Sequence, residues 1–231
     1  MTEAEWQACD NVEVMLSSVG CKGTERKVRL FSVACCRGVW DLLPDEWCKN
    51  AVALAEQFAD GQATDQERQN AHALGMELLG PGDPRNEPRG AALGTLGQPA
   101  AQHDGATPLF AEAFGTASAA VLAYANSRTA SDIATWHVFR EQAESLQLAF
   151  LRDIFGPLPF RSVTIDRAWT TVTVTSLAQT IYDERAFDRL PILADALEDA
   201  GCTNRDILDH CRQPGEHARG CWVVDLVLGK K

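Results

Sequence analysis

The sequence has little positive charge and no long hydrophobic run. Lys and Arg number 21 against 32 Asp and Glu, which gives a formal net charge of −11. A surface of that sign repels phosphate backbones and anionic lipids, so general nucleic-acid or membrane-surface binding is not expected. The closest candidate for a membrane span, Ala117–Ala125, is far shorter than the roughly 18 apolar residues required. The first residues also lack the basic start and apolar stretch of a secretory signal, so we expect a soluble, cytoplasmic protein without a membrane partner.

Several catalytic and ligand-binding motifs are missing as well. The sequence contains no P-loop, G-x-G-x-x-G, G-x-S-x-G, H-E-x-x-H or EF-hand loop. Their absence removes the common nucleotide-binding, serine-hydrolase, zincin and calcium-binding classes in their recognisable forms. The eight cysteines include no C-x-x-C pair, and a chain of 231 residues buries a core without needing disulfides. We therefore expect reduced thiols.

Glycine and proline are too few for a fibrous or disordered chain, but they gather in one segment. This segment, 81–107, predicts a linker or a long loop. It would separate an N-terminal helical lobe, 1–80, from a C-terminal helical lobe, 108–231. The two lobes could equally form one continuous domain. The prolines of the segment are Pro81, Pro84, Pro88 and Pro99.

Helical patterns cover most of the remaining chain. Thr2 with Glu5, and Thr64 with Glu67, have the spacing of a capping box, in which each side chain satisfies a free backbone N–H at a helix start. Apolar residues recur at helical spacing over 24–43 and predict one long helix, with a core-facing side opposite a polar side.

Only the segment 161–175 has β character, because Val and Ile are interspersed with Thr there. Helical spacing returns at about Ser176 and continues to the C-terminal end. The fold class we expect is mainly α. It would be a multi-helix bundle or an orthogonal helical array, with at most a short β-hairpin near 161–175.

The C-terminal segment concentrates thiol and imidazole side chains within twenty residues. These are the ligands that Zn²⁺ prefers, and four of them in a tetrahedron form a closed structural site. The spacing lacks the paired C-x2-C of a standard zinc finger, and buried cysteines are common in ordinary cores. We keep zinc as a candidate cofactor beside plain core packing. The candidate ligands are Cys202, His210, Cys211, His217 and Cys221.

The same segment also has the parts of a thiol nucleophile. His210 or His217 could withdraw the proton from Cys211 or Cys221. No family-type signature surrounds either cysteine, and no single acid stands out as the third, orienting group. The possible acids are Asp209, Glu216 and Asp225.

One basic cluster interrupts the acidic composition. In an acidic protein such a stripe could hold a phosphate or an acidic partner, and it is the one place where nucleic acid could bind. No aromatic platform accompanies it, so we interpret it as the solvated face of a helix. A role as a nucleic-acid accessory subunit would need binding that weakens steeply with salt. The cluster consists of Lys22, Arg26, Lys27, Arg29 and Arg37.

The two ends of the chain carry a family resemblance. The stretches concerned are Met1-Thr2-Glu3-Ala4-Glu5-Trp6, Arg29-Leu30-Phe31-Ser32-Val33-Ala34-Cys35-Cys36-Arg37, Ile181-Tyr182-Asp183-Glu184-Arg185, Leu193-Ala194-Asp195-Ala196-Leu197, His210-Cys211-Arg212 and Arg219-Gly220-Cys221-Trp222. They resemble an uncharacterised family of paralogous proteins of large-genome, planctomycete-type bacteria. The middle of the chain is unmatched. The resemblance implies a bacterial cytoplasm, and it brings neither an activity nor a catalytic residue.

These observations leave two function classes open. The first is a soluble helical protein–protein interaction or regulatory accessory module with a structural metal site in its C-terminal lobe; its partner would be another protein. The alternative is an enzyme with metal-assisted hydrolytic or thiol chemistry at Cys211, His217 and Cys221. Four protein ligands or fully buried thiols favour the module, whereas an open metal position or a lowered thiol pKa favours the enzyme.

Overall fold

The computed structural model describes residues 1–19, 25–83, 85–97, 108–128 and 133–230. These residues form helices and connections and no strand, which confirms the mainly α prediction. The α-helices are α1 (Glu3–Ala8), α2 (Val12–Val19), α3 (Glu25–Arg37), α4 (Glu46–Ala59), α5 (Asp65–Leu78), α6 (Asn86–Leu96), α7 (Pro108–Arg128), α8 (Ile133–Phe155), α9 (Val172–Glu184), α10 (Leu190–Asp199), α11 (Arg205–Arg212) and α12 (Trp222–Leu228), and 3-10 turns lie at η1 (Trp40–Leu42) and η3 (Phe187–Arg189).

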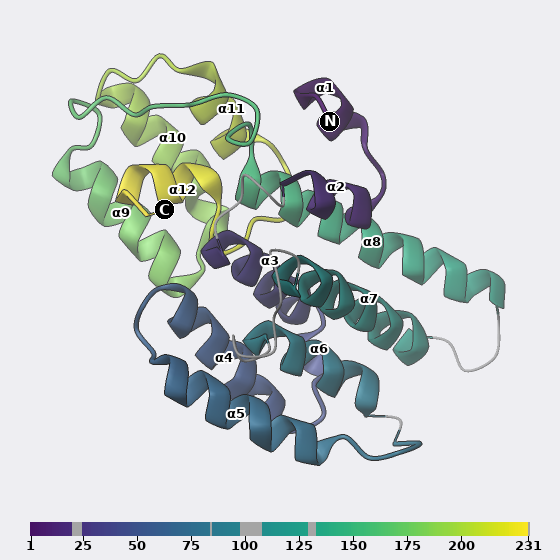
Figure 1. Ribbon diagram of the computed structural model, residues 1–231. Coiled ribbons are helices and arrows are strands. Elements are labelled where there is room, and N and C mark those ends of the chain that lie inside the picture. Colours follow the sequence, from purple (N-terminus) through teal and green to yellow (C-terminus); the bar gives the residue numbers. More distant parts are fainter. Residues whose placement is uncertain (20–24, 84, 98–107, 129–132, 231) are drawn as a thin grey trace.

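The helices form two groups. Helices α2 to α8 make a bundle around α3, and α9 to α12 make a smaller unit beside it (Figure 1). The long helix α8 runs from the far end of the bundle to the small unit, so its C-terminal turns lie where the two groups meet (Figure 1). No helix in the described part of the chain is both long enough and apolar enough to cross a membrane.

Local capping follows the sequence closely. Thr2 with Glu5 begins α1, and Thr64 with Glu67 begins α5, each as a complete capping box. In both, the threonine hydroxyl accepts a hydrogen bond from the glutamate N–H, and the glutamate carboxylate accepts one from the threonine N–H. These two helix starts confirm the prediction.

Helix α3 is shorter and more deeply buried than predicted. It ends at Arg37, and after Gly38 the chain continues as the 3-10 turn η1 and not as one helix to residue 43. Helices α4, α6, α7 and α8 pack around it, so its supposed polar side is also covered. Lys27 and Arg29 on that side are 8% and 7% exposed. The interpretation of a helix with one solvated face is therefore wrong.

The segment 81–107 is not a loop throughout, because 86–96 forms α6. Pro88 lies in the first turn of this helix, where a missing N–H breaks no hydrogen bond. The glycine at Gly94 lets α6 approach α7 closely, since a Cβ atom there would collide with the Thr116 hydroxyl. Small side chains thus build a helix contact where the sequence suggested a linker; residues 98–107 of the predicted linker lie outside the described part.

Residues 161–175 also differ from the expected β character. The chain connects through 161–171 without a strand, and α9 begins at Val172. The Thr171 hydroxyl accepts a hydrogen bond from the Val174 N–H and so caps this helix. The Thr175 hydroxyl donates a hydrogen bond to the Thr171 carbonyl, so this hydroxyl has a partner within the helix.

Two hydrophobic clusters make up the core. The larger one takes residues from α1 to α8, on both sides of 81–107, and reaches Phe155. The smaller one begins at Val163 and is built from α9 to α12. The change from one cluster to the other therefore falls near residue 160, and residue Ala218 returns to the larger cluster from the C-terminal segment. Polar and ionic side chains also lie where the two clusters meet.

The end of α8 gives a stability prediction. Gly156 has φ +51° and its α-carbon faces the Trp222 ring, so a Cβ atom meets both backbone strain and a close contact. We expect Gly156→Ala to lower the free energy of unfolding by about 2–4 kcal/mol. The matched control is Gly61→Ala, where φ is +70° but nothing lies within 4 Å of the added atom. That variant carries the strain alone and should cost about 1 kcal/mol in chemical denaturation; equal costs for the two variants would contradict the proposed contact.

Candidate metal centre

Four polar side chains meet at the boundary between the two hydrophobic clusters. They are Asp153 from the last turns of α8, His210 from the last turn of α11, His217 from the following loop and Cys221 directly before α12. One possible ligand atom from each lies within 4.8 Å of every other. Asp153, His210 and Cys221 are buried, and the His217 side chain is only 6% exposed. The group could therefore hold a metal ion.

Local structure brings the three C-terminal residues together. The Asn204 side chain caps the start of α11, and His210 lies on the buried side of this helix in its last turn. Bends at Gln213 and Gly215 redirect the chain and bring His217 to the end of α8. Cys221 then serves as the N-terminal cap residue of α12, with its side chain completely buried.

Asp153 is the common partner of the group. His217 Nδ1 lies 2.6 Å and His210 Nε2 lies 3.1 Å from the same carboxylate oxygen, Oδ1. The backbone N–H of Ala218 donates to the other oxygen, Oδ2, at 2.9 Å. His210 Nε2 also lies 3.3 Å from Cys221 Sγ. One buried carboxylate thus fixes two imidazoles and the loop that carries one of them.

Further contacts hold the two imidazole rings in place. The Gln213 side-chain amide lies 3.1 Å from His210 Nδ1, and His217 makes a hydrogen bond with the Gln213 backbone. The two imidazoles meet edge to face with centroids 5.1 Å apart, and the Trp222 ring packs against His210 at the same distance. Partners on the second ring nitrogen are typical of histidines that bind metals, because they set the tautomer and the orientation.

The electrostatics follow from burial and pairing. Burial alone would raise the pKa of Asp153, but its hydrogen bonds with His210 and His217 outweigh this and hold the pKa below its usual value. Burial alone would lower the pKa of His217, whereas its hydrogen bond to Asp153 raises it. The carboxylate is therefore ionised at neutral pH and could provide a negatively charged oxygen ligand.

The structure places the five sequence candidates in different surroundings. His210, His217 and Cys221 belong to the group, whereas Cys202 and Cys211 do not. Both of these thiols pack in the smaller hydrophobic cluster. In the described residues seven cysteines are free thiols, and Cys21 lies outside that part.

Asp153 is the member that sequence analysis missed. It lies 57 residues before His210, so no local spacing connects it to the histidines. One signal was present: Asp153 shares a helix face with Phe150 and Ile154, both buried, and a carboxylate at a core-facing position needs a partner.

The surroundings of the thiols do not favour nucleophilic chemistry. Burial raises the pKa of Cys211 to about 12 and that of Cys221 well above its ordinary value. A reactive thiol is typically accessible and has a lowered pKa. Of the three acids considered for orientation, Asp209 and Glu216 are exposed, and Asp225 is bound by Arg26.

The basic cluster is internal. Arg26 donates two hydrogen bonds to the Asp225 carboxylate, at 2.6 and 3.0 Å. Lys27 donates to the Ile154 carbonyl at 2.6 Å, and Arg29 donates to the Thr95 and Leu96 carbonyls at 2.8 Å each. The interpretation of these residues as a solvated face is therefore wrong. Lys22 lies outside the described residues.

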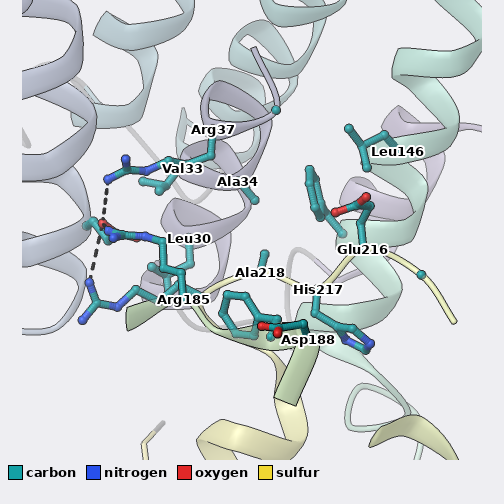
Figure 2. Close-up of a pocket in the computed structure, with 16 residues that line it drawn as sticks. Leu30, Val33, Ala34, Arg37, Leu146, Arg185, Asp188, Glu216, His217 and Ala218 are labelled. Atoms are coloured by element: carbon teal, nitrogen blue, oxygen red, sulfur yellow. Dashed lines mark hydrogen bonds and ion pairs between the residues drawn. The ribbon is translucent and has the colours of Figure 1, made fainter. Parts of the chain in front are cut away.

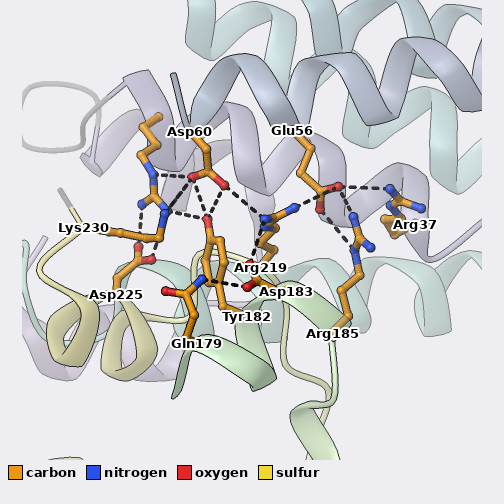
Figure 3. Close-up of polar contacts among 11 residues, drawn as sticks. Arg37, Glu56, Asp60, Gln179, Tyr182, Asp183, Arg185, Arg219, Asp225 and Lys230 are labelled. Carbon is orange, nitrogen blue, oxygen red and sulfur yellow. Dashed lines mark hydrogen bonds and ion pairs between the residues drawn. The ribbon is translucent and has the colours of Figure 1, made fainter. Parts of the chain in front are cut away.

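Around these cations a network of ion pairs joins α3 and α4 to the C-terminal unit (Figure 3). The Tyr182 hydroxyl donates to the Asp60 carboxylate at 2.7 Å and accepts from Arg26 at 2.7 Å. Arg37, Arg185 and Arg219 all reach Glu56. Such a network needs partners from segments far apart in sequence, which explains why the spacing of the basic residues alone suggested a surface.

Comparison of the chain with known protein families, with curated proteins and with solved structures found no match in any of the three. Function therefore has to be inferred from the geometry of the protein itself.

The network gives a second stability prediction. Asp225→Ala removes the buried carboxylate that Lys27 and Arg26 share and leaves Arg26 paired with Asp60 alone, so we expect the free energy of unfolding to fall by about 3–5 kcal/mol. The matched control is Asp195→Ala, which removes an exposed partner of Arg212 and should leave the stability nearly unchanged. Urea denaturation of both variants tests this; similar small effects would show that the internal pair is not a stabilising contact.

Proposed function

We propose that the protein is a helical interaction module whose C-terminal unit is held on the bundle by a structural zinc ion. The observation that carries this proposal is the buried group of Asp153, His210, His217 and Cys221. Three of its members come from the C-terminal unit and one from α8. A shared ion would therefore tie together two groups of helices whose contact is also made by ion pairs and by a few apolar side chains such as Ala218.

The donor set suits zinc. Imidazole nitrogen, thiolate sulfur and carboxylate oxygen are its usual ligands, and a tetrahedral ion keeps N and O ligands about 3.3 Å apart. The contact of His210 Nε2 with Asp153, at 3.1 Å, is close to that spacing, and its 3.3 Å contact with Cys221 Sγ would lengthen to about 3.6 Å because the zinc–sulfur bond is longer. The 2.6 Å contact between His217 and Asp153 would lengthen by several tenths of an ångström. A bound ion would replace the hydrogen-bonding protons between these atoms.

Four protein ligands support a structural role over a catalytic one, because they leave no open position for water or substrate. The buried thiols described above point the same way. With a net charge of −11 the surface suits a partner protein with a basic face, and free thiols suit the cytoplasm.

One observation favours the alternative, metal-assisted hydrolysis. A cavity of about 400 Å³ lies beside the group, and Asp153, His210 and His217 all line it. A water molecule could reach an ion there if Cys221 were not a ligand. Substitution with cobalt(II) distinguishes a structural ion from a catalytic one. A thiolate charge-transfer band with tetrahedral d–d bands favours the structural ion. A five-coordinate spectrum without thiolate ligation favours the enzyme.

Metal content is the first test. We expect about one zinc per chain in untagged protein purified without added metal. Cys221→Ser and His217→Ala should each lose most of it, because each removes one of the four ligands. Cys211→Ser and His137→Ala are the matched controls, a buried thiol and an exposed imidazole outside the group, and they should keep it. Elemental analysis, with circular dichroism to show that each variant is folded, measures the result.

Two results would contradict the zinc proposal. One is wild-type protein without metal, both as purified and after dialysis against zinc. The other is loss of zinc from Cys211→Ser to the same extent as from Cys221→Ser.

Removal of the metal should loosen the C-terminal unit selectively. An ion that binds only the folded form at 100 times its dissociation constant adds about 2.7 kcal/mol of stability. We therefore expect a chelator to lower the melting temperature and to speed amide hydrogen exchange in α11 and α12, which flank the ligands. Helix α4 contributes no ligand and serves as the internal control. Uniform acceleration across the chain would argue against a local tie.

A further inference from the structure

A second cavity, of about 650 Å³, lies between the bundle and the C-terminal unit (Figure 2). Helix α3 supplies one wall with Leu30, Val33 and Ala34. The loop 215–219 supplies another wall, and α8 contributes Leu146 and Phe150. The volume falls within the range of small-molecule sites, roughly 300–1,000 Å³.

The cavity has a cationic end. Arg37, Arg185 and Arg219 gather there around one carboxylate, Glu56, which is 2% exposed. Arg37 Nη2 lies 3.0 Å and Arg219 Nη1 lies 3.5 Å from Glu56 Oε2, and Arg185 binds both oxygens of Glu56. Figure 2 shows Arg37 and Arg185 on the same side of the cavity, and Figure 3 shows the contacts of both with Glu56 as dashed lines.

The donors outnumber the acceptors at this end. One carboxylate faces three guanidinium groups, and the nearest further carboxylate on Arg219 is Asp60, at 3.4 Å. The Nε atoms of Arg37 and Arg219 are buried and have no hydrogen-bond partner in the described structure. Buried guanidinium groups are normally matched by acceptors, and planar guanidinium suits a carboxylate in particular.

Most of the rest of the cavity wall is apolar or negatively charged, and His217 also lines it. Leu30 and Phe150 are buried side chains of its wall, and Phe187 adds a second aromatic ring. Asp188 and Glu216 are exposed and lie away from Arg37 and Arg185 (Figure 2). Their negative charge repels an anionic head group from that side and so favours one orientation, with the head group toward the arginines.

We propose that this cavity binds a small organic carboxylic acid with a hydrophobic body. Its carboxylate would accept hydrogen bonds from Arg37 and Arg185 beside Glu56, and its apolar part would lie against Leu30, Val33 and Phe150. The proposal does not depend on a metal ion, since none of the arginines belongs to the metal group.

The test uses compounds that share a body and differ in the head group. We expect 4-phenylbutanoate to bind the wild-type protein in isothermal titration calorimetry. Its uncharged amide should bind at least about tenfold more weakly, because charge-assisted hydrogen bonds to guanidinium are lost. The corresponding amine, 4-phenylbutylamine, should not bind. Octanoate and octanamide form a second pair with an aliphatic body.

Two variants locate the site. Arg185→Gln should weaken 4-phenylbutanoate about tenfold or more, whereas Arg161→Gln, an arginine paired with Asp206 outside the cavity, should not. Leu146→Trp fills the cavity without touching an ion pair and should abolish binding. Leu74→Trp adds the same bulk at a half-exposed position on α5 and should have no effect.

Melting curves show whether each variant is folded. If Arg185→Gln is unfolded, the binding result for Leu146→Trp tests the proposal. Three results would overturn the proposal: neither carboxylate binds at millimolar concentration, the amide or amine binds as tightly as the acid, or Leu146→Trp leaves the affinity unchanged.

Discussion

The arrangement of the C-terminal unit depends on one buried carboxylate. An ionised Asp153 is costly to remove from water unless hydrogen bonds or an ion replace the lost hydration. Here His210, His217 and the Ala218 N–H all supply that replacement, and all come from the unit beside α8. The carboxylate therefore stabilises the contact between the two helical groups only when the C-terminal segment places His210, His217 and the Ala218 N–H beside it. A shift of the loop by one residue would leave a buried charge without partners.

The ion-pair network acts on the same boundary from the other side. Lys27 on α3 donates to the carbonyls of Ile154 and Gly220, the residues next to Asp153 and Cys221. The Lys27 ammonium group thus links the end of α8 to the residue just before Cys221, next to two of the candidate ligands. Apolar clusters tolerate many relative positions of two surfaces, whereas buried ionic groups accept few, because each unpaired group is costly. The polar boundary gives the two clusters a defined orientation.

Local features of the fold could be predicted from the sequence, and long-range ones could not. The capping boxes at Thr2 and Thr64 rest on residues three apart, and the helices near the C-terminal end follow from short apolar patterns. His210, His217 and Cys221 were identifiable because they lie close together in the chain. Asp153 was not, since only the fold brings α8 to them. The interpretation of the basic residues of α3 was wrong for the same reason: a helical pattern cannot show that carboxylates from the C-terminal end of α4 and from α12 will cover the polar side.

The proposed metal and ligand sites share the loop 215–219. His217 is bound to Asp153, and the adjoining Ala218 and Arg219 line the larger cavity. An ion bound to His217 would also restrict the loop that forms this cavity wall. A ligand would then lose less conformational entropy when it binds, because the loop would already be ordered. Such coupling is reciprocal: any factor by which the ion tightens ligand binding is the factor by which the ligand tightens binding of the ion. A helical module built this way would respond to a small acid through the same loop that keeps its two halves together.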